Sequence, residues 1–224
     1  MKDWPLKEKP REKLLAYGAA TLSDAELIAI FLRTGIKGST ALDLARKLIA
    51  RFGNIRHLLE AKIQKFCELP GVGAAKYAEL QAALELSRRY LLTTLKRENV
   101  IKNPQIIKNY LISKLRHRHH ETLACVFLTH QLHLISFEEL FHGTINKVSI
   151  YPRCIIQRAL EQHAAAIILA HNHPSGHPLP SQLDIDFTRN IKKVLDIVDI
   201  RLLDHLVIGE SDIYSMAEHG LIDT

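Results

Sequence analysis

The chain contains 224 residues and carries a formal net charge of +6 at neutral pH, with a sequence pI near 9.2. This length allows one or two domains with a core of their own, and the mild basicity permits nucleic-acid binding without requiring it. No apolar run approaches the roughly 18 residues of a membrane span, and the first residues lack the apolar core of a signal peptide. The three cysteines form neither a metal-binding pair nor a disulfide framework, so we expect a cytoplasmic protein that does not enter the membrane.

The first part of the chain, residues 1–95, is predicted to be an all-α domain. Ser23 is a typical N-cap residue because it directly precedes a segment with an apolar helical period. Residues 40–52 and 74–92 likewise place their apolar side chains on one helical stripe. These patterns predict a helical bundle whose apolar stripes meet in one core.

A glycine-rich turn at residues 69–73 is similar to the hairpin of a helix-hairpin-helix motif. Gly71 and Gly73 allow a tight turn and a close approach of the backbone to a ligand. The free N–H groups of the next helix could then hold a DNA phosphate without reading sequence, and Lys76 could add charge. Residues 35–38 repeat the glycine spacing more weakly. The alternative is that these glycine turns join helices only for packing, or that the domain binds proteins.

The second part of the chain has a different pattern. Residues 96–103 are polar and precede a proline, which predicts a linker. From residue 104 to 224 strand patterns alternate with helical ones, and residues 123–128 and 132–137 are predicted to form a β-hairpin. We therefore expect an α/β domain with a mixed sheet over residues 104–224.

Two histidines and an aspartate stand where this domain changes from strand to helix. The apolar run at residues 164–170 predicts a strand buried on both faces, and His171 and His173 follow it directly. Being two residues apart, they project from the same face of a strand end. Asp184 follows a turn rich in proline and glycine and opens an amphipathic helix. Two imidazoles and one carboxylate are a typical ligand set for a catalytic zinc that keeps one position open.

An alternative interpretation of this segment involves no metal. Ser181-x-x-Asp184 is a helix capping box, which needs no ion. His-x-His alone is a weak signal, because the chain contains 13 histidines. The combination of strand, His-x-His, proline-rich turn and helix start favours the metal site.

The segment from His171 to Asp184 resembles the JAMM (MPN+) metalloprotease motif in the form carried by the bacterial RadC family. Similar segments occur at residues 9–15, 138–144, 151–153 and 203–209, so the resemblance covers nearly the whole chain. It implies an α+β protein with two domains: an all-α helix-hairpin-helix bundle, then an α/β JAMM domain whose mixed sheet is similar to that of cytidine deaminases. Deaminase chemistry itself is excluded, because His173 replaces the required glutamate and no Pro-Cys-x-x-Cys follows.

The resemblance also implies roles for individual residues. His171, His173 and Asp184 would bind zinc, which lowers the pKa of a bound water to about 7. Glu138 aligns with the family's glutamate and would act as general base, although its neighbour Glu139 stays an alternative because the strand register decides which carboxylate faces the site. Ser181 would donate a hydrogen bond to the developing oxyanion. His177, inside the motif, is expected to be a loop residue near the metal and not a ligand.

Two functions from different classes follow. The first is a zinc-dependent peptidase or isopeptidase that acts on a peptide or protein substrate and associates non-specifically with DNA. The second is a non-catalytic DNA- or protein-binding module that acts in DNA repair or recombination. An intact set of ligands, glutamate and serine favours the enzyme. The sequence names neither the substrate, nor the cleaved bond, nor the oligomeric state.

Overall fold

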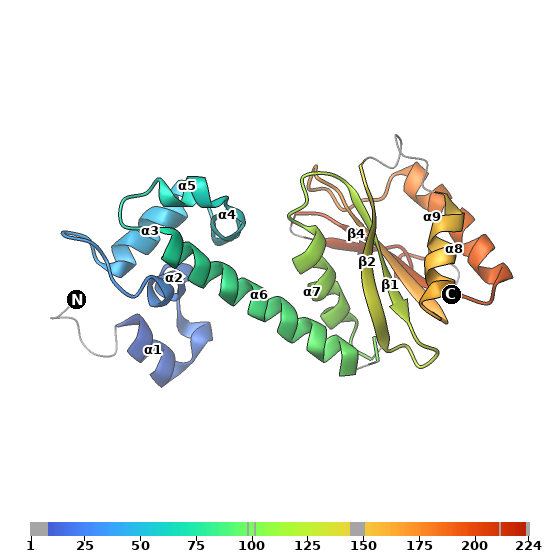
Figure 1. Ribbon diagram of the computed structural model, residues 1–224, viewed down its shortest axis with the longest axis horizontal. Coiled ribbons are helices and arrows are strands. Elements are labelled where there is room, and N and C mark those ends of the chain that lie inside the picture. Colours follow the sequence, from blue (N-terminus) through green and yellow to red (C-terminus); the bar gives the residue numbers. More distant parts are fainter. Residues whose placement is uncertain (1–8, 98, 101, 144–150, 211, 223–224) are drawn as a thin grey trace. The chain divides into compact units, whose positions relative to one another are not determined.

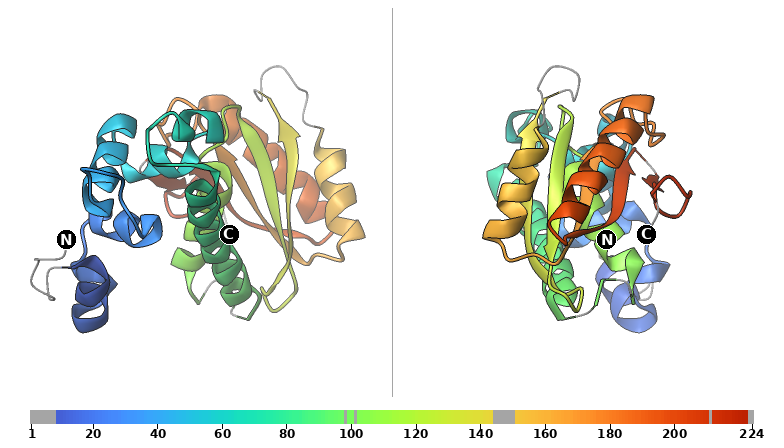
Figure 2. Two further views of the ribbon diagram at one scale, coloured as in Figure 1. Left: turned by 60° about the vertical axis from the view of Figure 1, so that its left-hand side comes forward. Right: turned by 90° about the vertical axis from the view of Figure 1, so that its right-hand side faces the viewer.

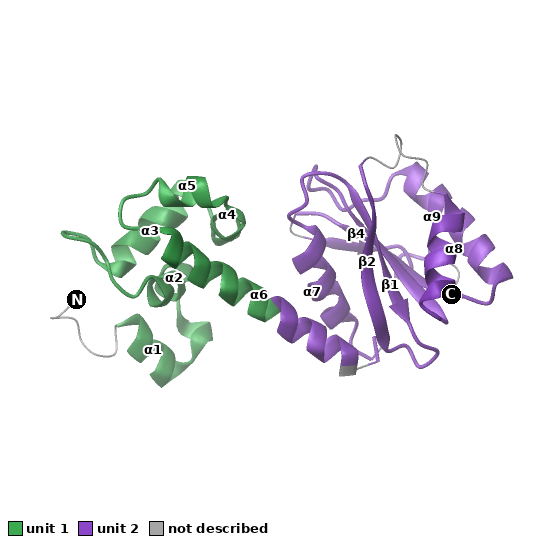
Figure 3. Ribbon diagram, viewed as in Figure 1, with its two compact units in different colours: residues 1–87 green, residues 88–224 purple. Residues whose placement is uncertain are grey.

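The computed structural model describes residues 9–97, 99–100, 102–143, 151–210 and 212–222 (Figure 1). The chain divides into two compact units, residues 1–87 and 88–224 (Figure 3). The linker was expected at residues 96–103, but the boundary between the two units lies within helix α6 (Ala74–Arg97), which covers only the first two of those residues. Leu95 at its end is buried in the core of the second unit.

The first unit is helical, as its apolar stripes predict. Its core combines the inner faces of several helices, and the stripe expected between residues 40 and 52 is buried there. Capping boxes fix two of the helix starts: Ser23 forms one with Glu26, and Thr40 forms another with Asp43. The helices before α6 are α1 (Pro10–Tyr17), α2 (Asp24–Leu32), α3 (Ala41–Phe52), α4 (Ile55–Glu60) and α5 (Ile63–Cys67), with a 3-10 turn η2 (Ala19–Thr21).

The second unit contains a mixed sheet of five strands in the order β2-β1-β3-β4-β5. Strands β1 and β2 form the expected antiparallel hairpin, β1 pairs with β3 antiparallel, and β3 pairs with β4 parallel. The α/β domain with a mixed sheet is therefore confirmed. The strands are β1 (Thr122–Leu128), β2 (Leu134–His142), β3 (Ala166–Asn172), β4 (Arg201–Ile208) and β5 (Ile213–Ser215).

Helices cover both faces of this sheet (Figure 2). Helix α7 (Pro104–Leu115) packs on one face, whereas α8 (Pro152–Glu161) and α9 (Gln182–Ile197) pack on the other. Strand β3 is buried on both faces, as its continuous apolar sequence predicts. The alternation of its side chains assigns Ile167 and Leu169 to the α8/α9 face, and His171 continues that row.

A bulge in β4 brings a third histidine to the α8/α9 face. Ile167 pairs with Leu202, but its neighbour Ile168 pairs with Asp204, so Leu203 is an extra residue in β4. If β4 were regular and included Leu203, period two would place Leu202 and Asp204 on one face and His205 on the other. With the bulge, His205 lies beside Leu169, on the same face as His171.

No helix in the described parts of the chain is both long enough and apolar enough to cross a membrane.

Candidate metal centre

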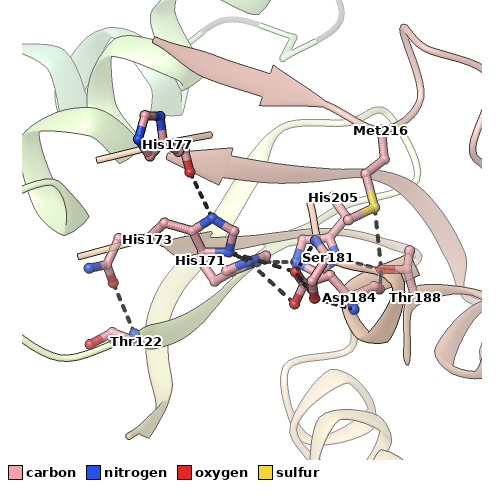
Figure 4. Close-up of polar contacts among 10 residues, drawn as sticks. Thr122, His171, His173, His177, Ser181, Asp184, Thr188, His205 and Met216 are labelled. Atoms are coloured by element: carbon pink, nitrogen blue, oxygen red, sulfur yellow. Dashed lines mark hydrogen bonds and ion pairs between the residues drawn. The ribbon is translucent and has the colours of Figure 1, made fainter. Parts of the chain in front are cut away.

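Four side chains converge at the C-terminal end of β3. Glu121, His171, His173 and Asp184 each offer one ligand atom, and these atoms all lie within 4.8 Å of one another. His171 lies at the end of β3, His173 directly follows this strand, and the aspartate lies in the first turn of α9. The structure thus brings together all three ligands that the sequence suggested, and Figure 4 shows their rings and carboxylate pointing toward one another.

The spacing of the ligand atoms fits a small tetrahedral cation. The Nε2 atoms of His171 and His173 are 3.0 Å apart, and each lies 3.6 Å from an oxygen of Asp184. Nitrogen and oxygen ligands 2.0–2.1 Å from a tetrahedral zinc ion are about 3.3 Å from one another. The donor types and their separations therefore suit zinc, and Glu121 offers a further ligand atom within 4.8 Å of the other three.

Hydrogen bonds from the helix start fix the Asp184 carboxylate. Its Oδ2 accepts from the Ser181 backbone N–H at 2.7 Å and from the Ser181 hydroxyl at 2.6 Å. In return the Asp184 N–H donates to Ser181 Oγ, so the capping box considered as an alternative is formed. The capping box and the metal ligand are one arrangement here, because capping leaves Oδ1 facing His171. The Ser181 hydroxyl donates to Asp184, so its expected role toward an oxyanion has no geometric support.

The His173 ring is oriented by the proline-rich loop. Its Nδ1 lies 2.8 Å from the backbone carbonyl oxygen of His177. A carbonyl can only accept, so Nδ1 carries the proton and Nε2 of the neutral ring presents its lone pair to the cluster. His177 acts through this carbonyl, and its own side chain is exposed.

The glutamate at the cluster is Glu121, which the sequence analysis did not single out. It directly precedes β1, and the buried side chain of Asn172 holds this segment against the end of β3. The Asn172 amide accepts from the Thr122 N–H at 2.9 Å and donates to the carbonyls of Arg118 and His120. The signal available in the sequence was that Glu121 lies just before β1, the strand that pairs with the histidine-bearing strand β3.

Glu138, expected to be the base, does not join the cluster. It faces α8, where Arg158 donates to both its oxygens at 2.7 and 2.8 Å and Gln162 donates to one of them. Glu138 pairs with Cys125, whose partner on β3 is Leu169 and not His171. Its face matches the expectation, but it lies too far along the sheet. The alternative, Glu139, accepts from Arg118 at 2.5 Å.

Burial and charge perturb the protonation of the cluster. Complete burial lowers the pKa of His171 to about 4, although the Asp184 charge opposes this. The Asp184 carboxylate raises the pKa of His173. Burial by itself would raise the pKa of Asp184, but His173, His171 and Ser181 together lower it well below its usual value. The cluster therefore holds an ionised carboxylate beside one ring that resists protonation and one that favours it.

The residues considered for DNA binding have roles inside the first unit. The Lys76 ammonium donates to the carbonyls of Thr34 and Gly71, at 3.0 and 2.8 Å. Gly71 has a φ of +89°, and a Cβ atom there would lie 2.3 Å from Ile36. Gly73 has no such neighbour within 4 Å. The structure places α5, the glycine turn and α6 where a helix-hairpin-helix was expected, but nothing identifies this turn as a DNA-binding motif.

Family models match two separate parts of the chain. Residues 101–221 match a family model described as the RadC-like JAB domain, and residues 1–78 match one described as UPF0758 N-terminal. Proteins named UPF0758 from Stutzerimonas stutzeri and Nitrosococcus oceani are each 52% identical over 220 residues, with 98% of both chains covered. A third, from Ectopseudomonas mendocina, is 51% identical over the same length. These relatives bear no name that states an activity.

Proposed function

Since the chain belongs to the RadC family, with a RadC-like JAB domain in its second unit, we propose that it is a zinc-dependent hydrolase of the peptidase or isopeptidase type. The observation that supports this most strongly is the convergence of two imidazole Nε2 atoms and a carboxylate at distances of 3.0 and 3.6 Å. A cation shared by these groups would offset the cost of holding an ionised carboxylate in a largely buried place. A second carboxylate, that of Glu121, lies in the same cluster.

Each residue has a distinct part in this proposal. His171, His173 and Asp184 hold the ion, which when bound supplies a Lewis acid and lowers the pKa of a water ligand. Glu121 accepts a proton from the attacking water and returns it to the leaving amine. Asn172 keeps Glu121 within reach, because its amide ties the segment before β1 to the strand that carries both histidines. Substrate binding to this site is expected to involve a peptide or protein.

The test compares two glutamates in the same domain. Purified protein is analysed for zinc, and the wild type, Glu121→Gln and Glu138→Gln are then assayed on a peptide library and on isopeptide-linked substrates. We expect about one zinc per chain in all three, the stoichiometry of a three-ligand site. Glu121→Gln should lose hydrolysis by about 10²–10⁴-fold, the usual contribution of a general base.

Glu138→Gln is the matched control, because it removes a carboxylate that already pairs with Arg158. It should retain most of the activity. Loss of activity in Glu138→Gln with full activity in Glu121→Gln would contradict the assignment of the base. A wild type that binds zinc but cleaves no substrate would favour the non-catalytic role in DNA repair or recombination.

A further inference from the structure

A buried relay of hydrogen bonds leads from the candidate metal centre into the core. Nδ1 of His171 lies 2.8 Å from Nε2 of His205, and Nδ1 of His205 lies 2.5 Å from the Thr188 hydroxyl. The same hydroxyl lies 2.6 Å from the backbone carbonyl oxygen of Asp184. All three side chains of the relay, shown in Figure 4, are at most 1% exposed. Neither His205 nor Thr188 is needed as a ligand or as a base.

We infer that His205 and Thr188 are positioning residues that hold His171 in the one tautomer able to bind a metal through Nε2. The inference rests on the proposed metal site, but it concerns the proton on a ring nitrogen, which exists whether or not an ion is bound.

The direction is set by the carbonyl of Asp184. A carbonyl oxygen only accepts, so an oxygen–oxygen distance of 2.6 Å requires that the Thr188 hydroxyl proton points to it. A hydroxyl has one proton, so Thr188 Oγ1 must accept from its other close partner, His205 Nδ1. His205 therefore carries its proton on Nδ1.

The tautomer of His205 determines the tautomer of His171. With Nδ1 protonated, Nε2 of neutral His205 is an acceptor, and His171 Nδ1 must donate to it. The proton of His171 then sits on Nδ1, and Nε2 presents its lone pair toward His173 and Asp184. The opposite tautomer would leave two acceptors 2.8 Å apart at one end of the ring and would direct an N–H at the metal position at the other.

The fold supports both members of the relay. Thr188 lies one helical turn after Asp184 on the buried face of α9, so one helix carries the ligand and the end of the relay. The β4 bulge brings His205 to the same face of the sheet as His171. Outer partners of this kind fix the tautomer and the ring orientation of metal-binding histidines.

The experiment uses an isosteric pair at Thr188. Thr188→Val removes the hydroxyl at nearly constant shape, and Thr188→Ser retains the hydroxyl and is the rescue variant. In the full-length metal-free protein, nitrogen-15 NMR of the imidazoles reports which nitrogen of His171 is protonated. Zinc affinity is then measured by competition with a chelator of known affinity.

We expect the wild type and Thr188→Ser to carry the His171 proton on Nδ1. Thr188→Val should show a mixture of tautomers and a zinc affinity about 10–100-fold weaker, as for other lost partners of metal-binding histidines. A wild-type proton on His171 Nε2 overturns the inference, and so does a Thr188→Val affinity equal to that of Thr188→Ser. If Thr188→Val does not fold, the wild-type tautomer and the Thr188→Ser affinity decide. Failure of the wild type to bind zinc, with His171 protonated on Nδ1, would refute the proposed function and leave the relay intact.

Discussion

The glycine turn of the first unit and the end of β3 in the second unit differ in how their polar groups are paired. In the turn, the Lys76 ammonium donates to two backbone carbonyls, so charge and acceptors satisfy each other within the fold. At the end of β3, two histidines and two carboxylates each bring one possible ligand atom within 4.8 Å of the others. The polar groups of the turn are explained by packing, whereas the groups at the end of β3 lie close enough together to share a cation.

The largest expected effect is on stability, from loss of the cation. At a free zinc concentration about 1,000 times Kd, binding to the folded state alone should stabilise the wild type by about 4 kcal/mol. Asp184→Ala removes one ligand and should lose most of this gain, as well as most of the zinc found after purification. Urea unfolding with zinc and with a chelator measures both proteins. Equal stabilisation of wild type and Asp184→Ala would mean that the ion binds elsewhere.

The next effect concerns acid stability without metal. The folded-state pKa of His171, about 4, lies below the ordinary value of 6.5, so the unfolded chain binds a proton in this range that the folded protein refuses. The stability due to His171 is therefore fully present above pH 6.5 and declines as the pH falls toward 4, by about 1.4 kcal/mol per pH unit. His205, whose pKa burial also lowers, adds to the decline, while the raised pKa of His173 opposes it.

Urea unfolding of the chelator-treated protein between pH 7 and pH 5 tests this sign. His171→Gln should flatten the pH dependence, because glutamine does not titrate. A metal-free protein that gains stability on acidification over this range would contradict the burial of uncharged histidines. His57→Gln is a suitable control, since this histidine is exposed in the first unit and its Nδ1 lies 3.2 Å from the Phe52 carbonyl oxygen.

A smaller effect is expected from the glycines of the first unit. Gly71→Ala places a Cβ against Ile36 at a φ of +89°, so we expect a loss of about 1–3 kcal/mol. Gly73→Ala meets no atom within 4 Å and should change stability little. Amide hydrogen exchange of residues 10–80 in the full chain reports local stability in this unit. Equal protection in the two variants would remove packing as the reason for Gly71.

The smallest effect sharpens the DNA question. If the full chain binds duplex DNA at low salt, Lys76→Met should leave the slope of log affinity against log salt unchanged, because the Lys76 ammonium is already bound to two carbonyls. A lysine that contacts a phosphate would instead reduce the slope by about one. A reduction of that size would support the hypothesis that the glycine turn is a DNA-binding hairpin.

What the sequence could predict depended on how local each signal was. The strand before His171, the helix after Ser181 and the capping box all rest on neighbouring residues, and each was found at its expected place. Glu121 was missed because its closeness to His173 depends on pairing between β1 and β3 and on the Asn172 side chain, which no local period reveals. The resemblance pointed to Glu138, but only the sheet register shows that it lies opposite Cys125.

The limits of the first unit were hidden for a similar reason. Polar residues after position 95 suggested a linker, yet α6 continues to Arg97 because Leu91, Leu92 and Leu95 pack into the core of the second unit. Polar residues show that one side of a helix is exposed, but they do not show that the other side packs into a core. A helix that belongs partly to one unit and partly to the next therefore gives no local signal in the sequence. The β4 bulge was likewise invisible, since Leu203 differs from its neighbours only in its pairing.

That single extra residue ties the face on which His205 lies to the number of residues before it in β4. Leu202 lies opposite Ile167 and Asp204 lies opposite Ile168, with Leu203 unpaired between them. If β4 ran from the same start as a regular strand that included Leu203, every later residue would shift by one pair, and His205 would exchange faces with Asp204. Removing Leu203 would instead leave a regular strand in which His205 keeps its face. Among homologous chains, we therefore expect a β4 without the bulge to be one residue shorter before the histidine.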